Sequence, residues 1–328
     1  MQCIDYDVIA RNATEIRKLS GVPLIAVVKS NAYGHGLAET ARSLCGIADY
    51  FAVSDVSEAL NVCSLNTPTM ILLPCLTISE LHAASTSDFW VTVCDERSLA
   101  LAAQSNLPLN LQIKIDSGMS RLGFSLEQLA QVLPTILSRK TLNVCGIFSH
   151  FRGTSRLECA EQYDEFARAG ELAEHALNKR LLKHIAATYA ALNYPEFRLD
   201  SVRVGLGLYG YGADFLQPAK TVSAKIIATR KVAAGQPVGY DGVFRPQRNT
   251  NLAVIDVGYA KGLSRALVGG NILVGGKSAT IRAVCMGMTI CDTGERSATV
   301  GEEVVLLGKG VNPSNCNTIV YELLCNLR

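Results

Sequence analysis

Eight short apolar runs alternate with helical patterns between residues 24 and 206, and this alternation constrains the fold more than any other feature of the 328-residue chain. Several runs are almost wholly apolar, as in LIAVV at Leu24–Val28. Continuous apolar strands separated by helices are typical of a parallel sheet covered on both faces. The predicted strands are Leu24–Val28, Tyr50–Ser54, Met70–Leu73, Trp90–Cys94, Leu109–Asp116, Val144–His150, His184–Thr188 and Ser201–Leu206.

The number of predicted strands favours a (β/α)8 TIM-type barrel, with an open doubly wound sheet as the alternative. Helical spacing at Tyr6–Leu19 places one more helix before the first strand. After Pro218 the pattern changes to strands separated by glycine-rich turns. We therefore expect an α/β barrel over residues 1–217 and a mainly β C-terminal domain over residues 218–328. The strands expected there are Lys220–Val232, Asn251–Gly258, Asn271–Val274, Ala279–Cys285 and Glu302–Leu307.

Composition argues against several classes of protein. The 48% of hydrophobic residues fits a folded chain rather than a disordered one. A formal net charge of +2 does not favour nucleic-acid binding, and no apolar run approaches the ~20 residues of a membrane span. Eleven cysteines without a CxxC pair fit buried free thiols, and five histidines lack metal-ligand spacing. We expect a cytoplasmic protein without a metal, a nucleic-acid partner or a membrane segment.

Chemically active side chains follow the ends of the predicted strands, which in a parallel barrel form the functional face. Lysine and arginine are rarely buried, yet Lys29, Lys114 and Arg203 lie in or against apolar strands. Gathered on one rim, they predict a cationic pocket for an anionic, phosphorylated ligand. The residues found at these strand ends are Lys29, Tyr33, His35, Lys114, Asp116, Arg121, His150, His184, Thr188, Arg203, Gly205 and Gly207.

The segment AVVKSNAYGHG at Ala26–Gly36 closely resembles the pyridoxal phosphate (PLP) attachment signature of alanine racemases. These are PLP enzymes of fold type III, and their relatives include serine/alanine racemases. The resemblance continues through KIDSGMSRLG at Lys114–Gly123, RVGLGLYG at Arg203–Gly210 and VGYDG at Val238–Gly242. It implies a PLP-binding barrel followed by a β-rich domain, in agreement with the strand pattern.

The resemblance also implies two bases, one on each face of the substrate Cα. Lys29 would form the Schiff base with PLP and serve one face, because a lysine amine condenses with an aldehyde. Tyr240 would serve the other face from the second subunit of a homodimer, bonded to His150. Arg203 would face the pyridine nitrogen of PLP, and His184 would orient Arg203.

Further residues would bind cofactor and substrate by the same resemblance. The cofactor contacts beyond Lys29 would be Tyr33, Arg121, Thr188, Arg203, Gly205 and Tyr321. The substrate contacts would be Arg121, Met286 and Tyr259, the last at the gate through which substrate passes. Lys114 matches a position that is carbamylated in some members.

The predicted function is interconversion of L- and D-alanine, supplying D-alanine for bacterial peptidoglycan. Gly287 stands where the family usually has Asp, Ala187 where it has Asn, and Lys261 where it has Asp. These departures leave the preference between alanine and serine open. One alternative is a serine or broad-specificity amino-acid racemase. Another, of a different class, is a non-catalytic PLP-binding regulatory protein, against which the β domain with Tyr240 argues.

Overall fold

The computed structural model describes residues 1–308 and 317–327. The chain divides into two compact units. The barrel unit comprises Tyr6–Ala32 and Gly36–Gln217. The second unit comprises Pro218–Arg328 together with Met1–Asp5 and Tyr33–His35.

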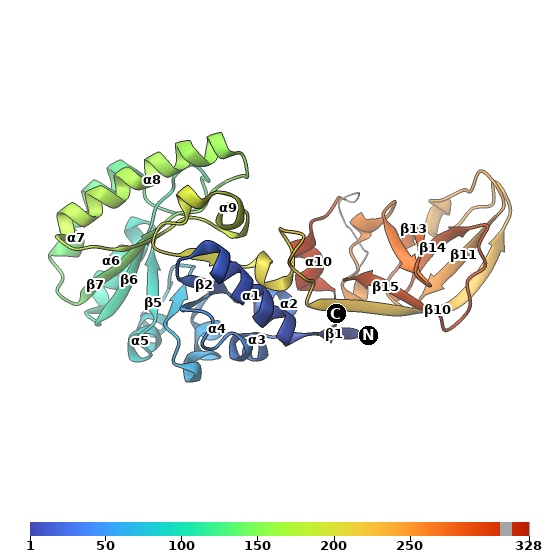
Figure 1. The fold of residues 1–328 in the computed structure, drawn as a ribbon, viewed down its shortest axis with the longest axis horizontal. Coiled ribbons are helices and arrows are strands. Elements are labelled where there is room, and N and C mark those ends of the chain that lie inside the picture. Colours follow the sequence, from blue (N-terminus) through green and yellow to red (C-terminus); the bar gives the residue numbers. More distant parts are fainter. Residues whose placement is uncertain (309–316, 328) are drawn as a thin grey trace. The chain divides into compact units, whose positions relative to one another are not determined.

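The barrel unit is built on parallel strands in the order β8-β7-β6-β5-β4-β3-β2-β9 (Figure 1). The outer strands β8 and β9 are joined where the Asp200 amide donates to Lys183 O at 3.2 Å and the Arg203 amide donates to Ala186 O at 2.9 Å. The barrel is therefore nearly closed, which confirms the predicted fold class. The strands are β2 (Leu24–Val27), β3 (Tyr50–Val53), β4 (Thr69–Ile71), β5 (Trp90–Val93), β6 (Leu109–Lys114), β7 (Leu142–Phe148), β8 (Leu182–His184) and β9 (Val202–Val204).

Helices lie between successive strands, as Figure 1 shows for α7 and α8 outside β6 and β7. Capping boxes begin α5, α6 and α7, because an N-cap Thr, Asp or Ser accepts from the amide three residues later. The helix predicted at Tyr6–Leu19 is α1. The helices are α1 (Tyr6–Ser20), α2 (Lys29–Gly34), α3 (Leu37–Ser43), α4 (Val56–Leu60), α5 (Ile78–Thr86), α6 (Glu96–Ser105), α7 (Leu126–Leu137), α8 (Arg156–Leu177) and α9 (Thr188–Asn193).

One predicted strand is misplaced along the chain. The sequence suggests a strand at His184–Thr188, whereas β8 ends at His184 and Thr188 already begins α9. The apolar segment between them is fully buried at Ile185 and Ala186. Its burial explains why it resembles a strand in the sequence.

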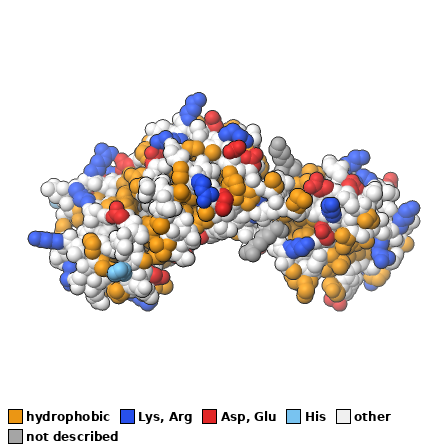
Figure 2. Space-filling model, turned by 90° about the horizontal axis from the view of Figure 1, so that it is seen from below, with side chains coloured by type: hydrophobic (Ala, Val, Ile, Leu, Met, Phe, Trp, Pro, Cys, Tyr) orange, Lys and Arg blue, Asp and Glu red, His pale blue; other side chains and the backbone are white. Residues whose placement is uncertain are grey.

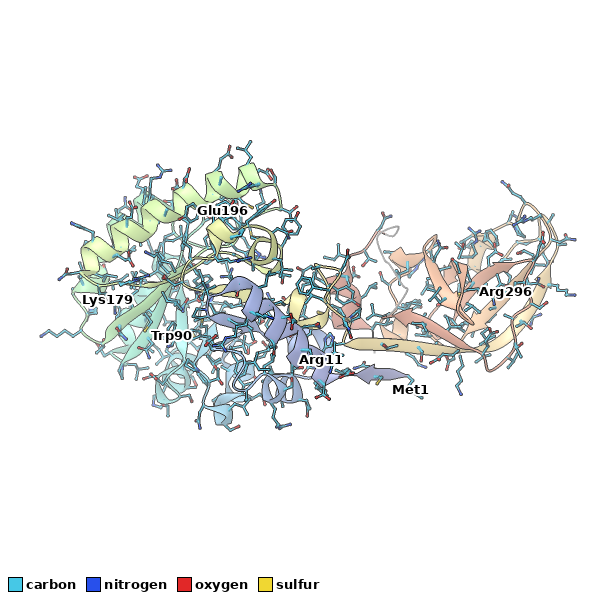
Figure 3. All side chains as sticks on the ribbon, viewed as in Figure 1. Met1, Arg11, Trp90, Lys179, Glu196 and Arg296 are labelled. Atoms are coloured by element: carbon cyan, nitrogen blue, oxygen red, sulfur yellow. The ribbon has the colours of Figure 1, made fainter. Side chains whose placement is uncertain are left out.

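The second unit is an antiparallel β structure in the order β1-β10-β11-β14-β13-β12-β15, with β10 also paired to β15. The N-terminal strand β1 pairs with β10, so that Gln2 lies opposite Val222 (Figure 3 labels Met1). Strands β1 and β14 were not expected from the sequence. The elements are β1 (Gln2–Ile4), β10 (Lys220–Val232), β11 (Thr250–Ile255), β12 (Asn271–Val274), β13 (Lys277–Val284), β14 (Thr289–Gly294), β15 (Glu303–Leu307) and α10 (Val320–Asn326).

The surface is mixed in charge. On the face drawn in Figure 2, Lys and Arg side chains lie interspersed with Asp and Glu. Within residues 1–308 and 317–327, no helix is both long and apolar enough to cross a membrane. The cysteines of the same ranges are all free thiols.

Candidate functional site

Lys29 follows β2 at the carboxyl end of the barrel strands and is the first residue of α2. Residues 30–33 all have positive φ, from 52° to 56°, so the chain coils left-handed directly after Lys29. This conformation costs L-residues roughly 1–2 kcal/mol each. Asn31 helps to hold this left-handed turn. Its backbone amide donates to Glu58 Oε1 at 3.0 Å, and its side-chain Oδ1 accepts from the Leu37 backbone amide at 2.8 Å. The turn therefore sets Lys29 in a fixed place at the barrel rim.

Arg203 on β9 is the centre of a buried hydrogen-bond network, with a side chain only 4% exposed. Its guanidinium donates to His184 Nδ1 at 2.7 Å, to Ser149 O at 2.8 Å and to His150 Nδ1 at 2.9 Å. A guanidinium has no acceptor atom, so both histidine nitrogens that face it must be unprotonated. The geometry therefore requires His184 and His150 to be neutral.

Electrostatics agree with neutral histidines. Burial lowers the pKa of His184 well below its ordinary value, and the Arg203 charge lowers it further. Burial likewise lowers the pKa of His150, with the charges of Arg203, Lys114, Arg121 and Lys29 all acting in the same direction. We call Lys29, Lys114, Arg121 and Arg203 the cation cluster. Several basic side chains close to one neutral imidazole make a site that favours an anion.

Lys114, at the end of β6, is a buried member of the cation cluster. Burial, followed by the charge of Arg203, lowers the pKa of Lys114 to about 7. Its Nζ donates to Ile115 O at 3.0 Å and lies 5.0 Å from the centre of the Phe148 ring. A substantial fraction of this amine is therefore unprotonated near neutral pH, and an unprotonated amine is a nucleophile.

Arg121 lies in a loop that Asp116 shapes. The Asp116 carboxylate accepts from the backbone amides of Gly118, Met119 and Ser120 at 2.9–3.0 Å. Further along, the Asp116 amide donates to Phe124 O at 3.0 Å and closes the loop. Asp116 is thus a loop-forming residue, and it presents the exposed Arg121 at the carboxyl end of β6.

Thr188 and the glycine turn after β9 lie together in the barrel unit. The Thr188 hydroxyl accepts from the Gly207 amide at 3.2 Å. A Cβ on Gly207 would lie 2.9 Å from the Ile16 side chain and 3.1 Å from the Thr188 methyl, so only glycine fits without displacing a neighbour. Gly205 precedes this turn as the residue before the short 3-10 helix Leu206–Tyr209. A hydroxyl beside glycine backbone amides suits phosphate oxygens.

In the second unit, Tyr33 and Tyr321 lie side by side, with ring centres 5.8 Å apart. The Lys220 ammonium donates to Gly34 O at 3.2 Å and to Leu324 O at 2.8 Å. A Cβ on Gly34 would lie 2.4 Å from the same Leu324 oxygen. These contacts fix the segment of Tyr33 against α10, which carries Tyr321.

Tyr240 lies at the tip of a tight loop and is 75% exposed. Val238 and Phe244 close the loop by mutual backbone hydrogen bonds of 2.9 and 3.3 Å. Asp241, at the tip, has a φ of 56°. The loop therefore presents the phenol of Tyr240 to solvent on a short backbone support.

Tyr259 and Met286 come together through their loops. The Tyr259 amide donates to Cys285 O at 3.0 Å, and the next amide donates to Met286 O, also at 3.0 Å. A Cβ on Gly258 would lie 2.1 Å from Cys285 O, so this close approach requires glycine. Met286 is 62% exposed, and Tyr259 is exposed as well.

Sequence reasoning missed Gln112, which joins the same network. Its Oε1 lies 2.9 Å from His184 Nε2, on the side of the imidazole away from Arg203. The only signal was a polar residue within the apolar strand LNLQIK. Separately, no group of three or more His, Cys, Asp or Glu in the described ranges is arranged to hold a metal ion.

Two models of known protein families match almost the whole chain. Residues 4–213 match the alanine racemase N-terminal domain, and residues 219–328 match the alanine racemase C-terminal domain. An alanine racemase of Pseudomonas fluorescens is 33% identical over 344 aligned positions, covering 99% of this chain and 96% of that protein. A catabolic alanine racemase of Pseudomonas aeruginosa is 31% identical, with the same coverage.

Solved structures agree. The biosynthetic alanine racemase of Pseudomonas aeruginosa superimposes with a TM-score of 0.89 at 28% identity, covering 100% of this chain and 96% of that one. The barrel, the β-rich second unit and the two family matches lead to one conclusion. This chain is an enzyme of the alanine racemase family.

Proposed function

We propose that the protein is a PLP-dependent racemase that interconverts L- and D-alanine by a two-base mechanism. One observation carries the proposal: the buried Arg203 of the cation cluster is held in place by two neutral histidines, His184 and His150. In this proposal residues 1–217 form the PLP-binding barrel and residues 218–328 form the β-rich C-terminal domain. Two such chains form a homodimer with shared active sites.

The residues present fit PLP. The cofactor, when bound, supplies an electron sink for the Cα–H bond of an amino acid. Lys29 is the amine that would hold it covalently, and Arg121 would lie near its phenolic oxygen. A dianionic phosphate is suited to hydroxyl donors and glycine backbone amides. The residues proposed to hold the phosphate are Tyr33, Thr188, Gly205 and Tyr321.

Arg203 is proposed to face the pyridine nitrogen. Since a guanidinium only donates hydrogen bonds, it would keep that nitrogen unprotonated and so restrain delocalisation of charge into the ring. His184 and His150 accept from Arg203 on the protein side and hold its plane. This restraint favours return of the proton to Cα over side reactions such as transamination.

Lys29 and Tyr240 are the proposed bases on the two faces of Cα. Tyr240 would come from the partner subunit, where its phenol would bond His150. Positive side chains beside this phenol would attract the negative charge that it develops when it gives up a proton. The 75% exposure of Tyr240 in the single chain supports a role that is completed by a partner.

Substrate contacts are proposed for Arg121 and for the backbone amide of Met286, the latter directed at the substrate carboxylate. Tyr259 would stand at the gate. Its loop is hydrogen-bonded to that of Met286, which supports a common role for the two residues.

Lys114 is proposed to be carbamylated. The pKa of about 7 and the burial of its amine favour attack on carbon dioxide. The amine nitrogen bonds to the carbon of CO2 and loses a proton to solvent, which gives a carbamate. Its new negative charge would hold Arg121. Intact-protein mass and ¹³C NMR in labelled bicarbonate should detect one carbamate per chain, which a Lys114→Met variant should lack.

We place the enzyme in the cytoplasm, with D-alanine supply to peptidoglycan as its role and with neither nucleic acid nor membrane as a partner. Relatives named catabolic and biosynthetic both match this chain. A serine or broad-specificity racemase is the alternative activity, since Gly287, Ala187 and Lys261 depart from the family pattern. A non-catalytic PLP-binding regulator is the alternative of a different class.

The test is purification with added PLP, an absorption spectrum, and racemisation assays on L-alanine and L-serine. We expect a yellow protein that racemises L-alanine faster than L-serine. A protein that stays colourless with excess PLP contradicts the cofactor assignment. A large preference for L-serine replaces the alanine assignment with the alternative, and a yellow protein inactive on both points to the regulator.

A further inference from the structure

Gln112 is a buried amide inside the barrel to which the proposed mechanism gives no role. It is 1% exposed and lies on β6, two residues before Lys114, so both side chains point to the same side of the strand. That side is the barrel interior, because Gln112 reaches His184 on β8. Bulky branched apolar residues usually fill this position in a barrel.

The hydrogen bonds around His184 leave only one protonation state. Arg203 donates to Nδ1 at 2.7 Å, so Nδ1 carries a lone pair. A neutral imidazole has one N–H, which must then be on Nε2. Nε2 lies 2.9 Å from Gln112 Oε1, an acceptor. Gln112 therefore matches the Nε2–H tautomer and no other.

The nitrogen of the same side-chain amide behaves differently from its oxygen. Gln112 Nε2 is buried and has no hydrogen-bond partner in the part of the chain that the structure describes. Gly146 on β7 lies opposite Gln112. A Cβ added to Gly146 would lie 3.3 Å from Gln112 Nε2. An unsatisfied buried amide destabilises a fold, whereas methionine of similar length would not carry this penalty. The contact of Oε1 with His184 therefore explains why position 112 holds glutamine, although an apolar residue there would give a more stable fold.

We propose that Gln112 is a positioning residue that accepts the Nε2–H of His184, holds the imidazole ring in place and thereby aims the Arg203 guanidinium. The inference rests on the proposed function only for what Arg203 does to the cofactor. The contact itself is a property of the protein without cofactor. Asn110 on the same strand serves as a control position. Its side-chain amide forms hydrogen bonds with Asp88 and Asn143. Asn143 in turn accepts from Lys179, which is labelled in Figure 3.

The first test is long-range ¹H–¹⁵N NMR of histidine-labelled protein without PLP, with the His184 signals assigned by a His184→Asn variant. We expect a protonated Nε2 and an unprotonated Nδ1 that do not titrate between pH 6 and pH 8. In Gln112→Met, Nε2 should stay protonated but lose its acceptor, so that its N–H signal shifts and exchanges faster with solvent. Gln112→Glu, which keeps an acceptor, should restore the Nε2–H signal, and Asn110→Leu should leave it unchanged.

The second test is kinetic. In Gln112→Met we expect kcat for L-alanine to fall about tenfold with KM nearly unchanged, and Gln112→Glu to recover part of the loss. Unaltered His184 signals in Gln112→Met, or a loss that Gln112→Glu does not relieve in either test, would overturn the proposal. A protein that binds no PLP would refute the proposed function while leaving the NMR result decisive for Gln112.

Discussion

The site residues of the barrel unit and those of the second unit differ sharply in how they are held. Arg203 is 4% exposed and makes three hydrogen bonds, while Tyr240 is 75% exposed at the tip of a loop. Met286 and Tyr259 are exposed in the same way. A single chain therefore carries a preorganised hydrogen-bond network in the barrel unit and a set of exposed side chains in the second unit. The difference fits our proposal that the buried Arg203 network is complete within one chain, whereas the exposed Tyr240 and Met286 need a partner.

The largest expected effect is total loss of racemisation in Lys29→Ala, with a loss of about 10²–10⁴-fold in Tyr240→Phe. Mixing the two inactive variants under subunit exchange should restore about one quarter of the wild-type rate. Half of a statistical mixture is heterodimer, and each heterodimer regains one of its two symmetric sites. Restored activity is measured against the unmixed variants. If nothing returns although exchange is verified, Tyr240 serves its own subunit.

The next effect concerns pH and the stability of the barrel. The pKa of Lys114 falls from its ordinary value to about 7 on folding. The folded state thus binds fewer protons than the unfolded state between pH ~7 and ~10, so stability should rise with pH across that window by roughly 3–5 kcal/mol. Urea midpoints in CO2-free buffer measure the rise. Lys114→Met should flatten it, and an equal slope in this variant would contradict the assignment.

A smaller effect is expected from Gly258→Ala in the second unit. The new methyl would lie 2.1 Å from Cys285 O, so the two loops must separate. We expect a loss of about 1–3 kcal/mol in stability, together with a higher KM for L-alanine. Gly276→Ala is a control with open space around its Cβ, although its φ of 73° adds some strain. Equal KM values for L-alanine in both variants would contradict the idea that Gly258 supports the proposed substrate gate.

The smallest effect should be on the thermal stability of Tyr240→Phe. The hydroxyl is exposed in the single chain and would make one hydrogen bond, to His150, in the proposed dimer, so the free energy of unfolding should change by no more than about 1.5 kcal/mol. Differential scanning calorimetry checks this value. The same variant would then have lost activity with an intact fold, whereas a drop of several kcal/mol would make Tyr240 a structural residue.

Much of the barrel could be predicted from the sequence because apolar strands and helices repeat clearly. Strand β14 could not, because its buried face is formed by Thr289, Cys291 and Thr293, which give no apolar alternation. The three-residue strand β1 is too short for any period, and its Gln2 and Cys3 are exposed.

The site shows the same limits. Charged residues at strand ends, such as Lys29 and Arg203, are visible because they interrupt apolar runs. Gln112 is neutral and sits inside such a run, so only its contact with His184 reveals it. The left-handed turn at residues 30–33 could not be predicted either, because Ser, Ala and Tyr rarely adopt a positive φ and a single Asn is a weak signal.

The pairing of β1 with β10 also bears on how the chain is made. Gln2 leaves the ribosome more than two hundred residues before Val222, its partner in the ladder. Until then the first strand has no sheet to join, and such distant pairing slows folding. A fragment that starts at Pro218 would lack β1 and leave this stretch of β10 without that neighbour, open to pairing with other chains. Anyone expressing the second unit alone should therefore restore the first five residues by fusion.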